Sequence, residues 1–270
     1  MNSFFIKSIT RSVSYLSALP LPKSVAFVVL FLFAKLFNMN IEEAEKPIRD
    51  YRSVDEWFTR GLKSKCRPIA KAESILSSPA DGTILNYGHI KNNSLIQAKR
   101  IDYSLNSLIP SDLSHHFKNG FFATIYLSPK DCHRVFSPVD GRIIGYLHVP
   151  GSIFPVREPY LSTVKGLFTR NERLVTFIKN KKGLLALVQV AAFNVGNMSV
   201  TYDAGICLND ASKGIQEKRY NEPLFILKGD WLATFHLGST VILLCSSEMT
   251  LKPLRENGAI RYGEEWFRFL

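Results

Sequence analysis

The stretch Phe235-His236-Leu237-Gly238-Ser239-Thr240-Val241-Ile242-Leu243-Leu244 places Gly-Ser-Thr inside an apolar run that is otherwise typical of a buried strand. Glycine is a poor strand residue, and within such a run it marks a bulge, a bend or a close approach to the backbone. A bulge in one strand is the simplest interpretation. The alternative is chemical, because the Ser239 hydroxyl could attack the unshielded carbonyl of Gly238 and exchange their peptide bond for a breakable ester.

The chain beyond Pro68 consists of short apolar runs separated by Gly, Pro, Asn and Asp, which predicts strands joined by turns. The clearest runs are Phe121–Leu127, Arg142–Val149 and Leu184–Val190. By contrast, the pattern from Ile41 to Leu62 is helical. We therefore expect an α+β protein, in which residues 66–270 form a β-rich core of antiparallel sheets arranged as a barrel or a sandwich.

The first 41 residues contain no acidic side chain, and they include the apolar run Val25–Ala34 between Lys23 and Lys35. Ten apolar residues are far fewer than the roughly 20 that a membrane-spanning helix needs. Residues 1–65 are therefore predicted to be a helical segment that associates with a membrane through amphipathic helices lying in the interface. A pair of core helices broken at Pro20 and Pro22, or an organelle presequence, would have a similar composition.

The charge and the cysteines limit the possible partners. The chain has 34 Lys and Arg against 23 Asp and Glu, so its net charge of +11 favours a phosphate-bearing partner, either nucleic acid or an anionic membrane. Nucleic acid is disfavoured, because the charges are spread along the chain and no aromatic-basic motif is present. The four cysteines are far apart, which indicates neither a zinc site nor a disulfide framework and favours a reducing compartment.

Two polar segments could supply catalytic groups. Asp81 lies in Ser78-Pro-Ala-Asp-Gly82, a corner signal that recurs as Ser137-Pro-Val-Asp-Gly141, where Asp140 is expected only to brace a turn. His133 follows a predicted strand within a polar loop between prolines, where a general base is well placed. The other histidines have no motif around them and are assigned surface or packing roles: His89, His115, His116, His148 and His236.

With Asp81, His133 and Ser239, nearly the whole chain resembles the pyruvoyl-dependent phosphatidylserine decarboxylases of bacteria and mitochondria. The matching segments are Asp50-Tyr-Arg52, Phe58-Thr-Arg60, Ser78-Pro-Ala-Asp-Gly82, Ile96-Gln-Ala-Lys99, Tyr103-Ser-Leu105, Asn119-Gly120, Tyr126-Leu-Ser-Pro129, Asp131-x-His133-Arg134, Val149-Pro-Gly151, Leu167-Phe168, Arg170-Asn-Glu-Arg173 and Leu237-Gly-Ser-Thr240. Each segment is weak evidence, but their combination in this order is highly specific.

The resemblance implies a proenzyme that cleaves itself at Gly238–Ser239. The products would be a β chain of residues 1–238 and an α chain of residues 239–270, whose Ser239 becomes a covalent pyruvoyl group. This group would form a Schiff base with phosphatidylserine and act as an electron sink, giving phosphatidylethanolamine and carbon dioxide. Neither a metal nor pyridoxal is expected.

The resemblance also implies partners and a location. The α and β chains would stay together as a heterodimer, and two heterodimers could pair. We expect a peripheral protein on the anionic cytoplasmic face of a bacterial cell membrane, with the mitochondrial inner membrane as the alternative. No nucleic-acid partner is expected.

One departure from the family pattern concerns the proton transfer. The family motif resembles D-Y-H-R-x-H-x-P, and its second histidine is usually paired with the aspartate of S-P-A-D-G to activate the serine. Here Phe136 occupies that position and Cys132 replaces the tyrosine. His133 matches the first histidine, and in a tight loop it could serve both steps, although positions 133 and 136 of an extended strand face opposite ways. The alternative is an unprocessed or inactive relative that only binds anionic phospholipid surfaces.

Overall fold

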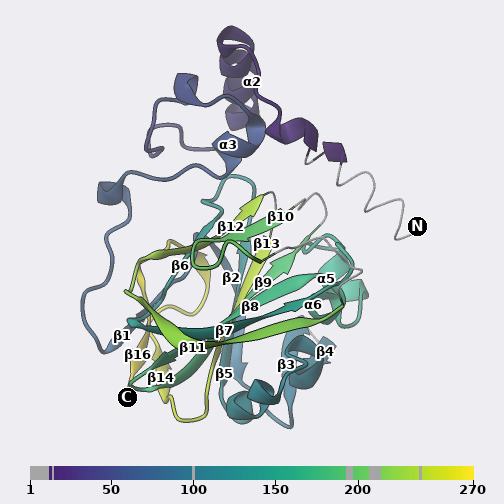
Figure 1. The fold of residues 1–270 in the computed structure, drawn as a ribbon, viewed down its shortest axis with the longest axis vertical. Helices are drawn as coiled ribbons and strands as arrows, with labels where there is room; N and C mark the ends of the chain where they lie inside the picture. Colours follow the sequence, from purple (N-terminus) through teal and green to yellow (C-terminus); the bar gives the residue numbers. More distant parts are fainter. Residues whose placement is uncertain (1–11, 14, 99–100, 193–196, 207–213, 237–238) are drawn as a thin grey trace.

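The computed structural model describes residues 12–13, 15–98, 101–192, 197–206, 214–236 and 239–270. Figure 1 shows a small helical part, which carries α2 and α3, beside a larger body of strands. The helical part has its own apolar cluster, in which Leu30 and Ala34 pack with Ile48, Tyr51 and Trp57. The strands enclose a separate and larger core.

The main sheet has eight antiparallel strands in the order β11-β7-β8-β9-β13-β5-β2-β15. Their bounds are β2 Gly82–His89, β5 Phe121–Leu127, β7 Gly141–Val149, β8 Arg173–Asn180, β9 Gly183–Ala191, β11 Gln216–Ile226, β13 Ser239–Cys245 and β15 Gly258–Ile260. This confirms the predicted antiparallel, β-rich core. The barrel form is wrong, because within the described ranges the two outer strands, β11 and β15, do not pair and the sheet stays open.

Three smaller sheets complete the body. One contains β1 Ile75–Ser77, β16 Glu265–Phe269 and β14 Leu251–Pro253, in that order, and a two-stranded sheet pairs β3 Ser94–Ala98 with β4 Ile101–Ser104. The third contains β10 Asn197–Val200, β12 Trp231–His236 and β6 Arg134–Phe136. The third sheet matters most for function, because β6 follows His133 directly and β12 ends close to Ser239 in the sequence.

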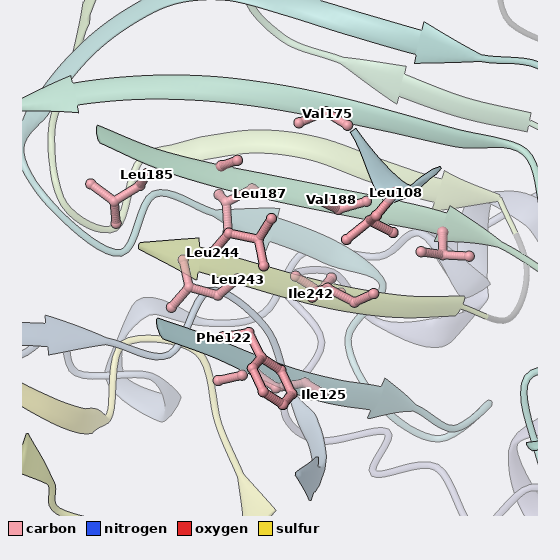
Figure 2. Packing of buried hydrophobic residues seen from close by; sticks show 14 of the residues in the cluster. Leu108, Phe122, Ile125, Val175, Leu185, Leu187, Val188, Ile242, Leu243 and Leu244 are labelled. Atoms are coloured by element: carbon pink, nitrogen blue, oxygen red, sulfur yellow. The ribbon is translucent and has the colours of Figure 1, made fainter. Parts of the chain in front are cut away.

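The core is deepest where β9 and β13 pair along their lengths. Every residue of both strands is buried, as expected for continuous apolar runs bounded by turns. Figure 2 shows Leu187 and Val188 of β9 together with Ile242 and Leu243 of β13. Complete burial of such a side chain stabilises the fold by about 1.5–3 kcal/mol. This packing fixes the position of β13, whose first residue is Ser239.

The run Phe235–Leu244 is not one strand. β12 ends at His236 and pairs with β10 and β6, whereas β13 begins at Ser239 and pairs with β5 and β9. The prediction of a single bulged strand is therefore wrong, because the chain passes from one sheet to another there. Leu237 and Gly238 lie outside the described residues.

The helices are short except for α2, Lys23–Leu36. The helical pattern expected from Ile41 to Leu62 is present only as short pieces, because Pro47 precedes a one-turn 3-10 helix, η1 Ile48–Asp50. The chain then starts afresh at α3, Val54–Phe58, where the Ser53 hydroxyl accepts a capping bond from the N–H of Glu56 at 3.0 Å. Other helical turns in the described residues are η2 Ser64–Cys66, α4 Leu105–Leu108, η3 Asp112–Phe117, α5 Tyr160–Thr163 and α6 Leu167–Arg170.

Candidate active site

Ser239 opens β13 in the interior of the main sheet. It is fully buried, and its backbone lies between Leu127 of β5 and Ala191 of β9. Its Oγ has no hydrogen-bond partner among the described residues. A buried polar atom without a partner costs about 1–3 kcal/mol, so such atoms are rare and are often kept for function. The sheet therefore fixes the backbone of the predicted nucleophile, and its hydroxyl has no partner in the described part of the chain.

Asp81 lies at the same edge of the main sheet as Ser239. It directly precedes β2, whose Thr83 pairs with Tyr126 of β5, while Ser239 pairs with Leu127 of that strand. Neighbouring strands are about 4.8 Å apart, so the start of β2 and the start of β13 are separated by about 10 Å. The two catalytic candidates from distant parts of the sequence are thus brought to one region.

The Asp81 carboxylate is engaged by an arginine. Arg67 donates to it from Nε at 3.1 Å and from Nη2 at 2.6 Å, and the backbone N–H of Tyr262 donates at 2.9 Å. Arg67 also reaches Glu43 at 3.0 Å. Burial alone would lower the pKa of Arg67, but the hydrogen bonds to these two carboxylates outweigh it and raise that pKa. The Asp81 corner is therefore fixed by a charged network.

Phe136 lies beside this corner. Its N–H donates to the Pro79 carbonyl at 2.8 Å, and its ring stacks on Tyr262 with the centroids 3.8 Å apart. A histidine at this position would face the neighbourhood of Asp81, but phenylalanine cannot move a proton. Cys132 packs in the same small cluster, and burial raises the pKa of its thiol to about 12, so it stays protonated at neutral pH. The two substituted positions therefore supply no base.

His133 is fully buried on the other side of β6. Its ring lies 3.9 Å from that of Phe58, and its Nδ1 is 3.0 Å from the Asp131 carbonyl oxygen. That contact assigns the ring proton to Nδ1, and Nε2 is left without a partner in the described part of the chain. Burial lowers the pKa of His133 to about 3. The imidazole is therefore neutral and presents an acceptor nitrogen.

His236, for which the sequence predicted only a surface or packing role, forms a polar pair that the sequence did not indicate. Its Nδ1 contacts both carboxylate oxygens of Asp55, at 2.9 and 3.0 Å, and its Nε2 lies 3.2 Å from the Ser199 hydroxyl. The side chain of His236 is 24% exposed, so the pair reaches solvent. The only signal in the sequence was position, because His236 stands two residues before Gly238.

The helical segment contributes directly to this region. Besides Asp55 and Phe58, it supplies Arg60, whose Nη2 donates to the Lys130 carbonyl at 3.1 Å. In return, Arg134 of β6 donates from Nε to the Thr59 carbonyl at 3.0 Å. Residues 55–60 therefore pack directly against His133, Arg134 and His236.

A cavity of about 510 Å³ lies elsewhere, between the start of β7, the β8–β9 turn and the end of β11. It is lined by residues 179–182, whereas Ser239 pairs with Ala191 at the opposite end of β9. At about 3.4 Å per residue, the length of β9 separates the two places by more than 25 Å. This cavity is not part of the candidate active site.

Comparison with known proteins identifies the family. The phosphatidylserine decarboxylase family model matches residues 54–268. A protein named phosphatidylserine decarboxylase proenzyme in Anaeromyxobacter sp. (strain K) is 37% identical to this chain, and the match covers 95% of this chain and 92% of the relative. A protein with the same name in Francisella tularensis subsp. novicida (strain U112) is 41% identical, and the match covers 84% of this chain and 80% of the relative. A relative with that name in Myxococcus xanthus (strain DK1622) is 34% identical over 95% and 92%. The chain belongs to the phosphatidylserine decarboxylase family.

Proposed function

We propose that this chain is a phosphatidylserine decarboxylase that cuts itself between Gly238 and Ser239 and carries a pyruvoyl group derived from Ser239. The observation that carries the proposal is the Ser239 hydroxyl, which is buried and has no partner within the described ranges. The surroundings fit such a group, because the Ser239 backbone is paired on both sides and its side chain has no partner among the residues that the structure describes. When formed, the pyruvoyl carbonyl supplies the electron sink for decarboxylation.

The two chains would remain a heterodimer after cleavage. The α chain, residues 239–270, would contain β13 to β16. Of these strands, β13 lies between β5 and β9, β15 pairs with β2, and β16 pairs with β1. Because all four pairing strands belong to the β chain, backbone hydrogen bonds and core packing hold the pieces together.

His133 and Asp81 have separate roles in this proposal. The locked Nδ1–H of His133 leaves its Nε2 as an acceptor, which can take a hydrogen bond from the amine of phosphatidylserine in a site that excludes water. Asp81 acts as a fixed charge: its bonds to Arg67 and Tyr262 hold the corner that faces Phe136. The competing hypothesis is that the chain is an uncleaved relative that only binds anionic phospholipid. That function would require neither His133 nor Asp81.

The state of the purified chain tests the proposal directly. We expect a denaturing gel to show two fragments, and intact-mass measurement to assign them to residues 1–238 and 239–270. The α chain should resist Edman degradation, because a pyruvoyl group has no free amine. A single full-length species after prolonged incubation would favour the competing hypothesis.

The same proposal places the protein on an anionic membrane surface through α2. One side of this helix is buried within the helical part through Ala26, Leu30 and Ala34. Its other positions leave large apolar side chains exposed, among them Val25, Phe27, Val28, Leu32 and Leu36. In the described part of the chain, no helix combines the length and apolar character needed to cross a membrane. We assign the cytoplasmic face of a bacterial membrane, with the mitochondrial inner membrane as the alternative.

Charged substitutions on the exposed side of α2 should weaken membrane binding. Val28 and Leu32 are 53% and 60% exposed, so Val28→Glu with Leu32→Glu leaves the buried side of the helix intact. We expect at least about a tenfold loss of binding to vesicles of anionic phospholipid, because apolar insertion and attraction of cations add at an interface. Vesicle flotation measures this.

A matched control is Phe225→Glu, which changes an exposed side chain on β11, far from α2 in Figure 1. This variant should bind vesicles like the unmodified chain. Equal binding by the α2 variant would remove α2 from the membrane contact and favour the core-helix interpretation of the N-terminal segment.

A further inference from the structure

We propose that His236, held by Asp55, accepts the proton of the Ser239 hydroxyl during chain cleavage. This inference rests on the proposed function and names the base that the self-cleavage requires. In this proposal the Asp55–His236 pair carries out the proton transfer that Phe136 cannot perform.

The other groups near the site are poorly suited to this step. The oxygens of the Asp81 carboxylate are taken by Arg67 and by the N–H of Tyr262. The Cys132 thiol is buried and protonated, and the buried His133 has a pKa of about 3. A general base is most effective when its pKa is near the working pH. The reaction therefore requires a base other than Asp81, Cys132 and His133.

His236 has the geometry of a prepared base. Its Nδ1 lies 2.9 Å from Asp55, a contact that places the ring proton on Nδ1 and stabilises the imidazolium that forms when Nε2 takes a proton. The Nε2 atom is 3.2 Å from the Ser199 hydroxyl, so in the resting chain it already accepts from a serine. The order Ser199–His236–Asp55 is that of a Ser-His-Asp relay.

His236 lies only three residues before Ser239 in the sequence. It is the last residue of β12, and Ser239 is the first residue of β13. Three residues of chain span at most about 11 Å, so the Cα atoms of His236 and Ser239 lie within that distance. The proposed step requires Nε2 to turn from the Ser199 hydroxyl to the Ser239 hydroxyl. Asp55 lies on α3, whose N-terminus is capped by Ser53. The Asp55 carboxylate is therefore held by a part of the structure separate from β12. Partial exposure of His236 lets its proton exchange with water.

The proposed step is an isomerisation and needs no further reactant. His236 Nε2 takes the Ser239 Oγ proton while Oγ forms a bond to the carbonyl carbon of residue 238. The bond from that carbon to the Ser239 nitrogen then breaks, and the nitrogen receives the proton from Nε2–H. The product is an ester and a free amine, and His236 is neutral again.

Replacing either member of the pair should slow chain cleavage. General-base catalysis contributes about 10²–10⁴-fold, so we expect His236→Ala to slow fragment formation at least about 100-fold in a time course after cell-free synthesis. Asp55→Asn should slow it to a smaller extent, and Asp55→Glu should restore part of the rate, because Asp55 is a positioning residue. His89→Ala, a histidine change on β2, should cut at the unmodified rate.

A rescue experiment separates loss of the base from loss of the fold. In the His236→Ala background, Phe136→His supplies an imidazole beside the Asp81 corner, and added imidazole supplies one from solution. Cleavage restored by either addition supports the proposal. No restoration by either would show that His236 acts structurally and would overturn it.

The outcomes also separate this inference from the proposed function. If the unmodified chain is cut at residue 238 while His236→Ala and Asp55→Asn are cut equally fast, the inference fails and the proposed function stands. If the unmodified chain is never cut, the proposed function itself fails.

Discussion

A chain carrying Ser239→Ala should remain one species of about 30.5 kDa and show no decarboxylase activity. Without the hydroxyl there is no nucleophile for the acyl shift, and therefore no source for the pyruvoyl group. The fold should be at least as stable, because Oγ has no partner among the described residues and an unsatisfied buried hydroxyl costs stability. Intact-mass measurement and thermal unfolding check both parts.

Ser246→Ala is the matched control for this variant. Ser246 directly follows β13 and is also buried, but its Oγ accepts a hydrogen bond from the N–H of Leu184 at 3.0 Å. Its loss should lower the free energy of unfolding by about 1 kcal/mol while cleavage continues. Fragments of the expected mass from Ser239→Ala would exclude Ser239 as the nucleophile.

The second large effect concerns His133. We expect His133→Ala to be cut normally but to lose decarboxylase activity by about 100-fold or more, because it removes the acceptor Nε2 that we propose binds the substrate amine. The activity must be measured per cleaved chain, so that maturation and catalysis are counted separately.

Phe58→Leu controls for packing in this experiment, because it alters the ring contact with His133 and leaves the imidazole in place. It should retain most of the activity. If His133→Ala also stops cleavage, His133 serves both steps, as a tightly turned loop would allow. In that case His236 is not the proton acceptor.

The strands were predictable because their signals are local. The strand β5 matches the predicted run Phe121–Leu127, and β7 and β9 extend only slightly beyond the predicted runs. Continuous apolar runs between turn residues determine such strands wherever they lie in the fold. The break between β12 and β13 was not predicted, because the sequence of two neighbouring apolar runs does not indicate which sheet each strand joins.

The site was predictable only in part, because its contacts join distant segments. Ser239 and Asp81 could be singled out from their own motifs. The pairing of Asp55 with His236 crosses 181 residues, and neither residue belongs to a motif. The bond between Arg67 and Asp81 depends on where the corner before β2 lies after folding. Long-range polar contacts of this kind follow from the tertiary structure alone.

The central place of β13 has a consequence for the life of the mature protein. Cutting the chain before this strand turns the pairing of β13 with β5 and β9 from an internal contact into an association of two polypeptides. The folded pair keeps its packing, but once unfolded its pieces can diffuse apart, and reassembly then depends on their concentration. Under the proposed cleavage, unfolding of the mature protein would be practically irreversible, and the lifetime of the enzyme would be governed by its unfolding rate.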